Sequence, residues 1–227
     1  MNGLSHIIKS NMRQVFSCLS VVLLAGSCLA VPRPHVIVLG KWRTVEVHSD
    51  SSEGAQANAQ QVKVRTLTID GRSREYTTGA VHEVTDRYFV VRRAYLLNEA
   101  LPQDAKNPQW IWRLGGWISI DRQTGRIAQL NLPAFDGDSS DASWYRDYAA
   151  YCGTSDDGSK TYLVVAQFGK RKPIVRKEYS GAACVAPTWE RGPSRVTFAA
   201  AGEKTSFVVH AHSADLQTET TEEENQQ

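Results

Sequence analysis

The sequence predicts a mainly β-protein, a single antiparallel sandwich or barrel-like domain of about ten strands with one short helix. Most of the chain alternates between apolar and polar residues, turn-forming residues recur at short intervals, and only one segment has helical spacing. The 227 residues are 41% hydrophobic and 22% charged, which excludes a chain disordered throughout, a collagen and a polytopic membrane protein. A small or partial β-propeller is the alternative architecture.

The strands are expected mainly as hairpins. Two short runs, residues 35–39 and 42–47, come first, and a loop rich in Ser, Ala and Gln follows them. Asp70-Gly71 then favours a two-residue turn, because both turn positions need positive φ. A long strand is expected over residues 87–97. The predicted hairpins join residues 61–69 to 72–78, 109–121 to 126–132, 160–168 to 173–179, and 195–199 to 205–211.

One segment departs from the strand pattern. Trp144, Tyr148 and Tyr151 recur at helical spacing, and Asp141 suits the start of a helix. Gly153 suits its end. The spacing predicts one short helix over residues 141–152, packed against a sheet.

The N-terminus has the layout of a secretory signal. Lys9 and Arg13 precede a short apolar stretch that ends in small residues. We predict export by a signal peptide spanning residues 1–30, with cleavage after Ser27 or Ala30. The alternatives are a lipoprotein that carries its lipid on Cys28 and an uncleaved anchor.

The remaining chain divides into a β-rich domain over residues 31–214 and an acidic tail over residues 215–227. The tail holds five acidic residues and no basic residue, so we expect a solvated, disordered end. Only Cys152 and Cys184 follow the signal, and an oxidising compartment favours their pairing. Such a disulfide would stabilise the fold by about 4 kcal/mol on the chain-entropy model.

Several segments carry resemblances to known groups. Residues 117–126 resemble the strand, Asp, Thr-Gly turn and strand of quinoprotein-like repeats, and residues 155–162 resemble blade turns of secreted propellers. Residues 35–215 resemble a group of uncharacterised exported bacterial proteins. The segments that carry this resemblance are residues 90–94, 115–117, 129–133, 143–153 and 155–158. The resemblance implies export and a shared fold, and it transfers no activity and no site.

Two groups of polar residues have the spacing of metal ligands. The first fits a calcium loop and consists of Asp136, Asp138, Ser140 and Asp147. Asp141 stands where such a loop needs glycine, so a capped helix start is the favoured interpretation. His210 and His212 share one face of a strand and lack an identifiable third ligand. We therefore predict no metal and no cofactor.

Two surface features could bind a ligand. The first is a basic loop of Lys170, Arg171 and Lys172, whose positive field could attract an anionic polymer or a lipid surface. The second is a Trp cluster of Trp110, Trp112 and Trp117, whose flat rings could contact a sugar or peptide. A solvated turn and ordinary core packing are the simpler interpretations of these features.

The leading function hypothesis is a non-catalytic exported binding module of the cell envelope or the secreted fraction. Its partner would be an anionic polymer, a glycan or an envelope protein, and we expect no nucleic acid and no transmembrane segment in the mature chain. The alternative is an extracytoplasmic hydrolase that acts on a glycan. A pocket that holds two carboxylates, or Ser and His within hydrogen-bond reach, would favour the hydrolase.

Overall fold

A computed structural model describes residues 33–48, 59–104, 106–180 and 184–217. The fold is mainly β, as the alternation predicts, and a 3-10 turn at Pro102–Asp104 is the one helical element among the described residues. The predicted signal peptide lies outside them. A helix long and apolar enough to cross a membrane is not found in the described ranges.

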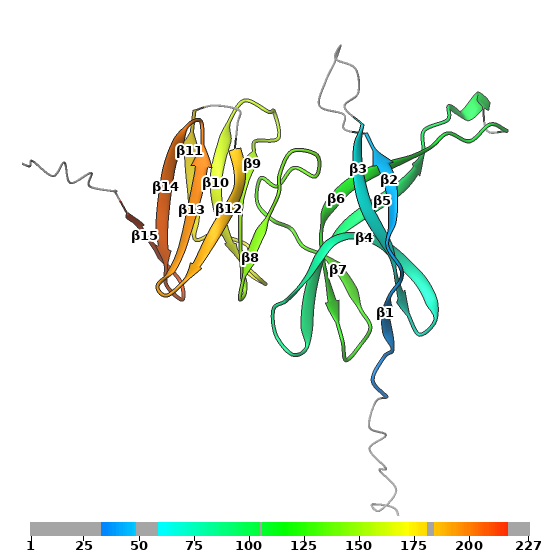
Figure 1. Cartoon of the computed structure of the whole chain (residues 1–227), viewed down its shortest axis with the longest axis horizontal. Coiled ribbons are helices and arrows are strands. Elements are labelled where there is room, and N and C mark those ends of the chain that lie inside the picture. Colours follow the sequence, from blue (N-terminus) through cyan, green and yellow to red (C-terminus); the bar gives the residue numbers. More distant parts are fainter. Residues whose placement is uncertain (1–32, 49–58, 105, 181–183, 218–227) are drawn as a thin grey trace, which may run out of the picture. The chain divides into compact units, whose positions relative to one another are not determined.

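Sheet A is a seven-stranded sheet that includes a ring of paired strands (Figure 1). β3 pairs with both β2 and β4. β2 also pairs in parallel with β6, at Val47 and Trp112, so strands β2 to β6 form a closed ring. At the predicted hairpin turn, Asp70 and Gly71 both have positive φ. The strands are β1 (Ile37–Leu39), β2 (Arg43–Val47), β3 (Gln60–Ile69), β4 (Arg72–Glu83), β5 (Tyr88–Asn98), β6 (Trp110–Asp121) and β7 (Ile127–Gln129).

Sheets B and C are four-stranded meanders that pack on each other. A shared core of Tyr148, Ala150, Leu163 and Val165 from sheet B meets Val196, Phe198 and Phe207 from sheet C. Sheet B contains β8 (Ser143–Tyr145), β9 (Tyr148–Thr154), β10 (Thr161–Gln167) and β11 (Val175–Tyr179). Sheet C contains β12 (Cys184–Arg191), β13 (Ser194–Ala200), β14 (Glu203–Val209) and β15 (Ala214–Gln217).

The predicted disulfide is confirmed and links the two sheets. Cys152 of β9 and Cys184 of β12 are bonded, with their Cα atoms 6.3 Å apart. All four predicted hairpins form, as β3–β4, β6–β7, β10–β11 and β13–β14. β15 extends three residues into the predicted acidic tail, where Leu216 pairs with Phe207. Residues 218–227 lie outside the described residues.

The predicted helix over residues 141–152 is wrong, because this segment forms the hairpin β8–β9. Arg146, at positive φ, begins its tight turn, and Tyr145 pairs with Tyr148. Tyr148 packs in the core shared with sheet C, whereas Tyr151 packs in a second core on the opposite face of sheet B. A strand buried on both faces is apolar throughout, so its aromatic residues also fit helical spacing.

Residues 130–142 connect sheet A to sheet B and cover the second face of sheet B. Leu132 and Phe135 pack beside Tyr151, whose hydroxyl donates a hydrogen bond of 2.8 Å to the carbonyl of Pro133. The Thr154 amide donates to the carbonyl of Ala134. These contacts fix the segment that leads into the wall of the largest pocket described below.

Candidate functional site

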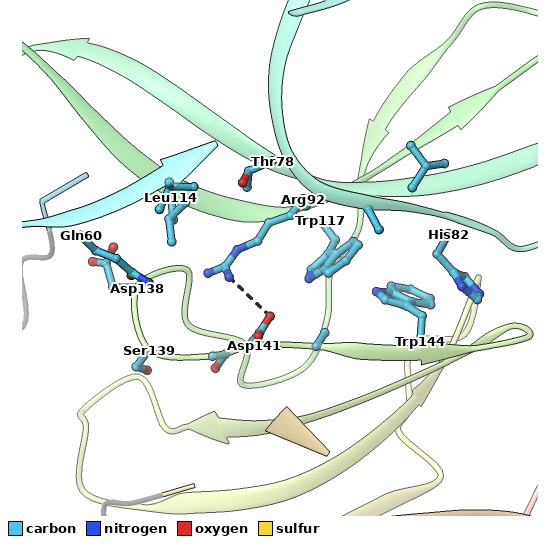
Figure 2. Close-up of a pocket in the computed structure, with 16 residues that line it drawn as sticks. Gln60, Thr78, His82, Arg92, Leu114, Trp117, Asp138, Ser139, Asp141 and Trp144 are labelled. Carbon is cyan, nitrogen blue, oxygen red and sulfur yellow. Dashed lines mark ion pairs between the residues drawn. The ribbon is translucent and has the colours of Figure 1, made fainter. Parts of the chain in front are cut away.

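A pocket of about 590 Å³ opens beside sheet A, a size typical of small-ligand sites (Figure 2). One wall comes from β3, β4, β5 and β6, and the other from residues 138–144. The β4 wall is irregular, since a register shift falls between Thr78 and His82 and Gly79 there has positive φ. The lining residues include Gln60, Thr78, His82, Arg92, Leu114, Trp117, Asp138, Ser139, Asp141 and Trp144.

Arg92 provides the charge of the pocket wall on sheet A. Its Nη2 donates a hydrogen bond of 2.6 Å to the carbonyl of Gly137, and its Nε donates a longer one to Gly115. Its Nη1 lies 3.6 Å from Oδ1 of Asp141, beyond hydrogen-bond distance. Burial lowers the pKa of the Arg92 guanidinium. Nearby carboxylates, chiefly that of Asp141, partly oppose this lowering of the pKa. The Nη1 edge therefore faces the pocket without a close acceptor.

Trp117 brings a second hydrogen-bond donor to the same place. Its side chain is 7% exposed, and its indole Nε1 has no hydrogen-bond partner. A buried donor without a partner is uncommon and costs free energy. Figure 2 shows this nitrogen on the side of the ring that faces the Arg92 guanidinium. The two donors converge on one part of the pocket.

Two further rings complete the aromatic part of the pocket. Trp144 lies against Trp117, with ring centroids 5.4 Å apart, and stacks on His82 at 5.6 Å. The Nε2 of His82 is 2.6 Å from the carbonyl oxygen of Arg146, a hydrogen bond that holds the imidazole in place. The pocket thus offers apolar ring surface next to polar groups.

The oxygen atoms of the four residues with calcium-loop spacing serve other contacts. Oδ1 of Asp136 accepts from the Asp138 amide, and the Ser140 hydroxyl donates to the carbonyl of Cys152 at 2.7 Å. Asp147 instead accepts from Nε2 of Gln167. In the described ranges, no three His, Cys, Asp or Glu side chains lie close enough together to hold a metal ion.

The structure places the three residues of the Trp cluster in different surroundings. Trp110 is 59% exposed, near the end of the β5–β6 hairpin. Trp112 packs edge-on against Tyr76, and the Arg43 guanidinium lies 4.7 Å from its ring centroid. Only Trp117 lines the pocket.

The basic loop connects β10 to β11 and is exposed. Lys170, Arg171 and Lys172 form no ion pair with any described carboxylate. They line a pocket of about 440 Å³ together with His212. Lys170 and Arg171 also line a pocket of about 460 Å³ that includes Trp144. The remaining histidine of the predicted pair, His210, contacts Asp215 at 3.1 Å.

The residue types alone did not single out Arg92, Asp141 or Trp144 as site residues. Each belongs to an apolar or turn-rich segment with an ordinary pattern. Comparison of the chain with protein-family models, curated proteins and solved structures finds no match, so function is inferred from the site itself.

Proposed function

We propose that the protein is an exported, non-catalytic binding module that holds a sugar ring in the pocket of Arg92, Trp117 and Trp144. The observation that carries this proposal is the buried indole N–H of Trp117, which lines the pocket and lacks a partner. A ligand oxygen at this position would complete its hydrogen bonding. Binding would then remove the free-energy cost of the unpaired indole N–H, and this would favour the bound state.

The chemistry of the lining suits a sugar in particular. Sugars have apolar C–H faces, which pack on aromatic rings, and hydroxyl groups, which both donate and accept hydrogen bonds. Trp117 and Trp144 supply the rings, Arg92 supplies a donor, and Asp138 and Asp141 supply acceptors. A purely apolar ligand would make no hydrogen bond with these polar groups.

Export is supported by two features of the chain. The N-terminal residues have the basic, apolar and small-residue order of a secretory signal. The disulfide between Cys152 and Cys184 fits a protein that matures in an oxidising compartment. A glycan is a ligand that an exported protein meets there.

The polar contacts of the pocket favour binding over hydrolysis. The Ser140 hydroxyl donates to the Cys152 carbonyl, and the Nε2 of His82 contacts the Arg146 carbonyl, so these side chains do not form a nucleophile–base pair. Asp141 faces the guanidinium of Arg92. The two pocket carboxylates keep the hydrolase as the alternative outcome of the test.

The test is isothermal titration calorimetry with neutral and acidic monosaccharides and their short oligomers. We expect saturable binding of at least one sugar, which Trp117→Phe weakens by about tenfold or more because the indole donor is lost. Trp110→Phe makes the same change at an exposed ring outside the pocket, and this variant should bind as the natural chain does. Ser139→Tyr changes an exposed residue of the pocket wall, so it blocks the site without disturbing a core.

Each outcome decides between the hypotheses. Binding that Trp117→Phe and Ser139→Tyr both weaken supports the module. Release of reducing ends from an oligomer, lost on Asp138→Asn or Asp141→Asn, would replace it with the hydrolase. Absence of binding to every sugar of the panel would overturn the proposed function.

A further inference from the structure

We propose that the ligand is an acidic polysaccharide, which places one uronate carboxylate on Arg92 and Trp117 and continues past Trp144 to the basic loop. This inference rests on the proposed function and adds the charge and the length of the ligand. Two separate observations carry it: the converging donors in the pocket, and the residues that successive pockets share.

The first observation is a pair of donors in the pocket wall that make no hydrogen bond. Nη1 of Arg92 and Nε1 of Trp117 both face the pocket, and neither makes a hydrogen bond. A sugar hydroxyl could accept a hydrogen bond from one of these donors. A carboxylate has two oxygens and can accept from both. A ligand carboxylate in hydrogen-bond contact would lie closer to the guanidinium than the Asp141 carboxylate does at 3.6 Å.

In the structure, the Asp141 carboxylate lies near the position proposed for the ligand carboxylate, but it makes no hydrogen bond to Arg92. Its side chain is 65% exposed, and its Oδ1 stays 3.6 Å from the guanidinium (Figure 2). The Arg92 side chain is 13% exposed, so water competes mainly for the Asp141 carboxylate and weakens its hold on the guanidinium. The side chain can therefore turn outward when a ligand carboxylate arrives.

The second observation is that the pockets adjoin through shared residues. Trp144 lines both the Arg92 pocket and the pocket of about 460 Å³. Gln167, Lys170 and Arg171 line both the latter pocket and the pocket of about 440 Å³. On this basis the proposal places the chain from Arg92 past the ring of Trp144 to the basic loop.

The charge of the basic loop fits the later units of such a chain. Lys170, Arg171 and Lys172 are exposed and have no ion-paired carboxylate among the described residues. Their field would attract a repeated anion and would weaken as salt rises. A neutral polysaccharide would gain no charge attraction from them.

The first experiment compares sugars that differ only at C6, namely galacturonate with galactose and glucuronate with glucose, by calorimetry. We expect one uronate to bind at least tenfold more tightly than its neutral partner. Asp141→Asn removes the competing carboxylate and should raise uronate affinity by about threefold. Equal binding of acid and neutral sugar, both weakened by Trp117→Phe, would overturn this inference and leave the proposed function intact.

The second experiment varies chain length. We expect a galacturonate or glucuronate hexamer to bind more tightly than the monosaccharide. The double substitution Lys170→Gln with Arg171→Gln should reduce hexamer affinity by about tenfold and leave monosaccharide affinity unchanged. Arg191→Gln with Lys204→Gln, at exposed positions of sheet C, is the matched charge control. Binding of inorganic polyphosphate without binding of either hexamer, or equal affinity for hexamer and monosaccharide, would overturn the inference.

Discussion

Gly153 shows how a single residue shapes the pocket wall. A Cβ atom at this position would collide with the carbonyl oxygen of Ala134, whose segment lies against β9. The same carbonyl accepts a hydrogen bond from the Thr154 amide, so it cannot move away without losing that bond. Glycine thus allows residues 130–142 to lie flat on sheet B.

We expect Gly153→Ala to lower the free energy of unfolding by about 1–3 kcal/mol, the usual cost of overpacking. Urea denaturation followed by fluorescence measures it. Gly116→Ala is the control, because a Cβ there would meet nothing closer than Nε2 of Gln129 at 3.9 Å. Equal stability of the two variants would contradict the close packing described for Gly153.

Asp121 holds the turn between β6 and β7. Its carboxylate accepts two hydrogen bonds from Arg87, of 3.0 and 2.6 Å, and one from the Gln123 amide. The Arg87 hydrogen bonds hold the pKa of Asp121 well below its usual value. A carboxyl whose pKa is lower in the folded chain stabilises that state above its unfolded pKa, and this gain is lost as pH falls toward the folded pKa.

We therefore expect Asp121→Asn to be less stable than the natural chain at neutral pH. The difference should shrink progressively as pH falls below about 4, where the unfolded carboxyl becomes protonated. Urea denaturation at a series of pH values from neutral to acid gives the difference directly. A difference that stays constant down to the most acidic pH would show that the carboxylate contributes no such stabilisation.

At the residue scale, alternation alone misplaces one Trp of the cluster. Trp112 and Trp117 are five positions apart and would face opposite sides of a regular strand. In β6 the register shifts around Gly115 and Gly116, because Arg92 pairs with Trp117 and Ala94 with Leu114. The bulge therefore brings Leu114 and Trp117 to the same pocket. No local pattern fixes the position of such a bulge, so the sequence could not locate the site.

At the element scale, turn chemistry made the hairpins predictable. Asp70-Gly71 fixes one turn, and Asp121 with Gly125 fixes another through hydrogen bonds within the turn. β9 was not predictable in this way, since burial on both faces removes the alternation that marks a strand. β12 was not predicted either, and its pairing with β13 shifts register between Val185 and Thr188.

The disulfide is a covalent link between elements of two sheets. It joins β9 to β12, residues separated by 32 positions, and so ties sheet B to sheet C. We expect Cys152→Ser with Cys184→Ser to lower the free energy of unfolding by about 4 kcal/mol on the chain-entropy model. Thermal unfolding of the natural chain with and without reductant provides the matched comparison. An unchanged melting temperature on reduction would contradict this contribution.

At the scale of the whole molecule, we propose that residues 1–30 act as an export signal for the β-rich domain that follows. We expect the protein expressed with its N-terminus in a bacterial cell to be exported and cleaved after Ser27 or Ala30. Intact-mass spectrometry of the envelope and secreted fractions identifies the new N-terminus. A lipid-modified Cys28 would indicate a lipoprotein, and an uncleaved chain in the cytoplasm would contradict export.

The central claim is that a ligand oxygen completes the hydrogen bonding of Trp117, and NMR can observe that group directly. The chain has six Trp residues, and Trp117→Phe identifies the indole N–H signal of Trp117 in a nitrogen–proton correlation spectrum. We predict that a uronate hexamer shifts the Trp117 signal with saturation while that of Trp110 stays in place. A Trp117 signal that does not move while the hexamer binds elsewhere would contradict the claim.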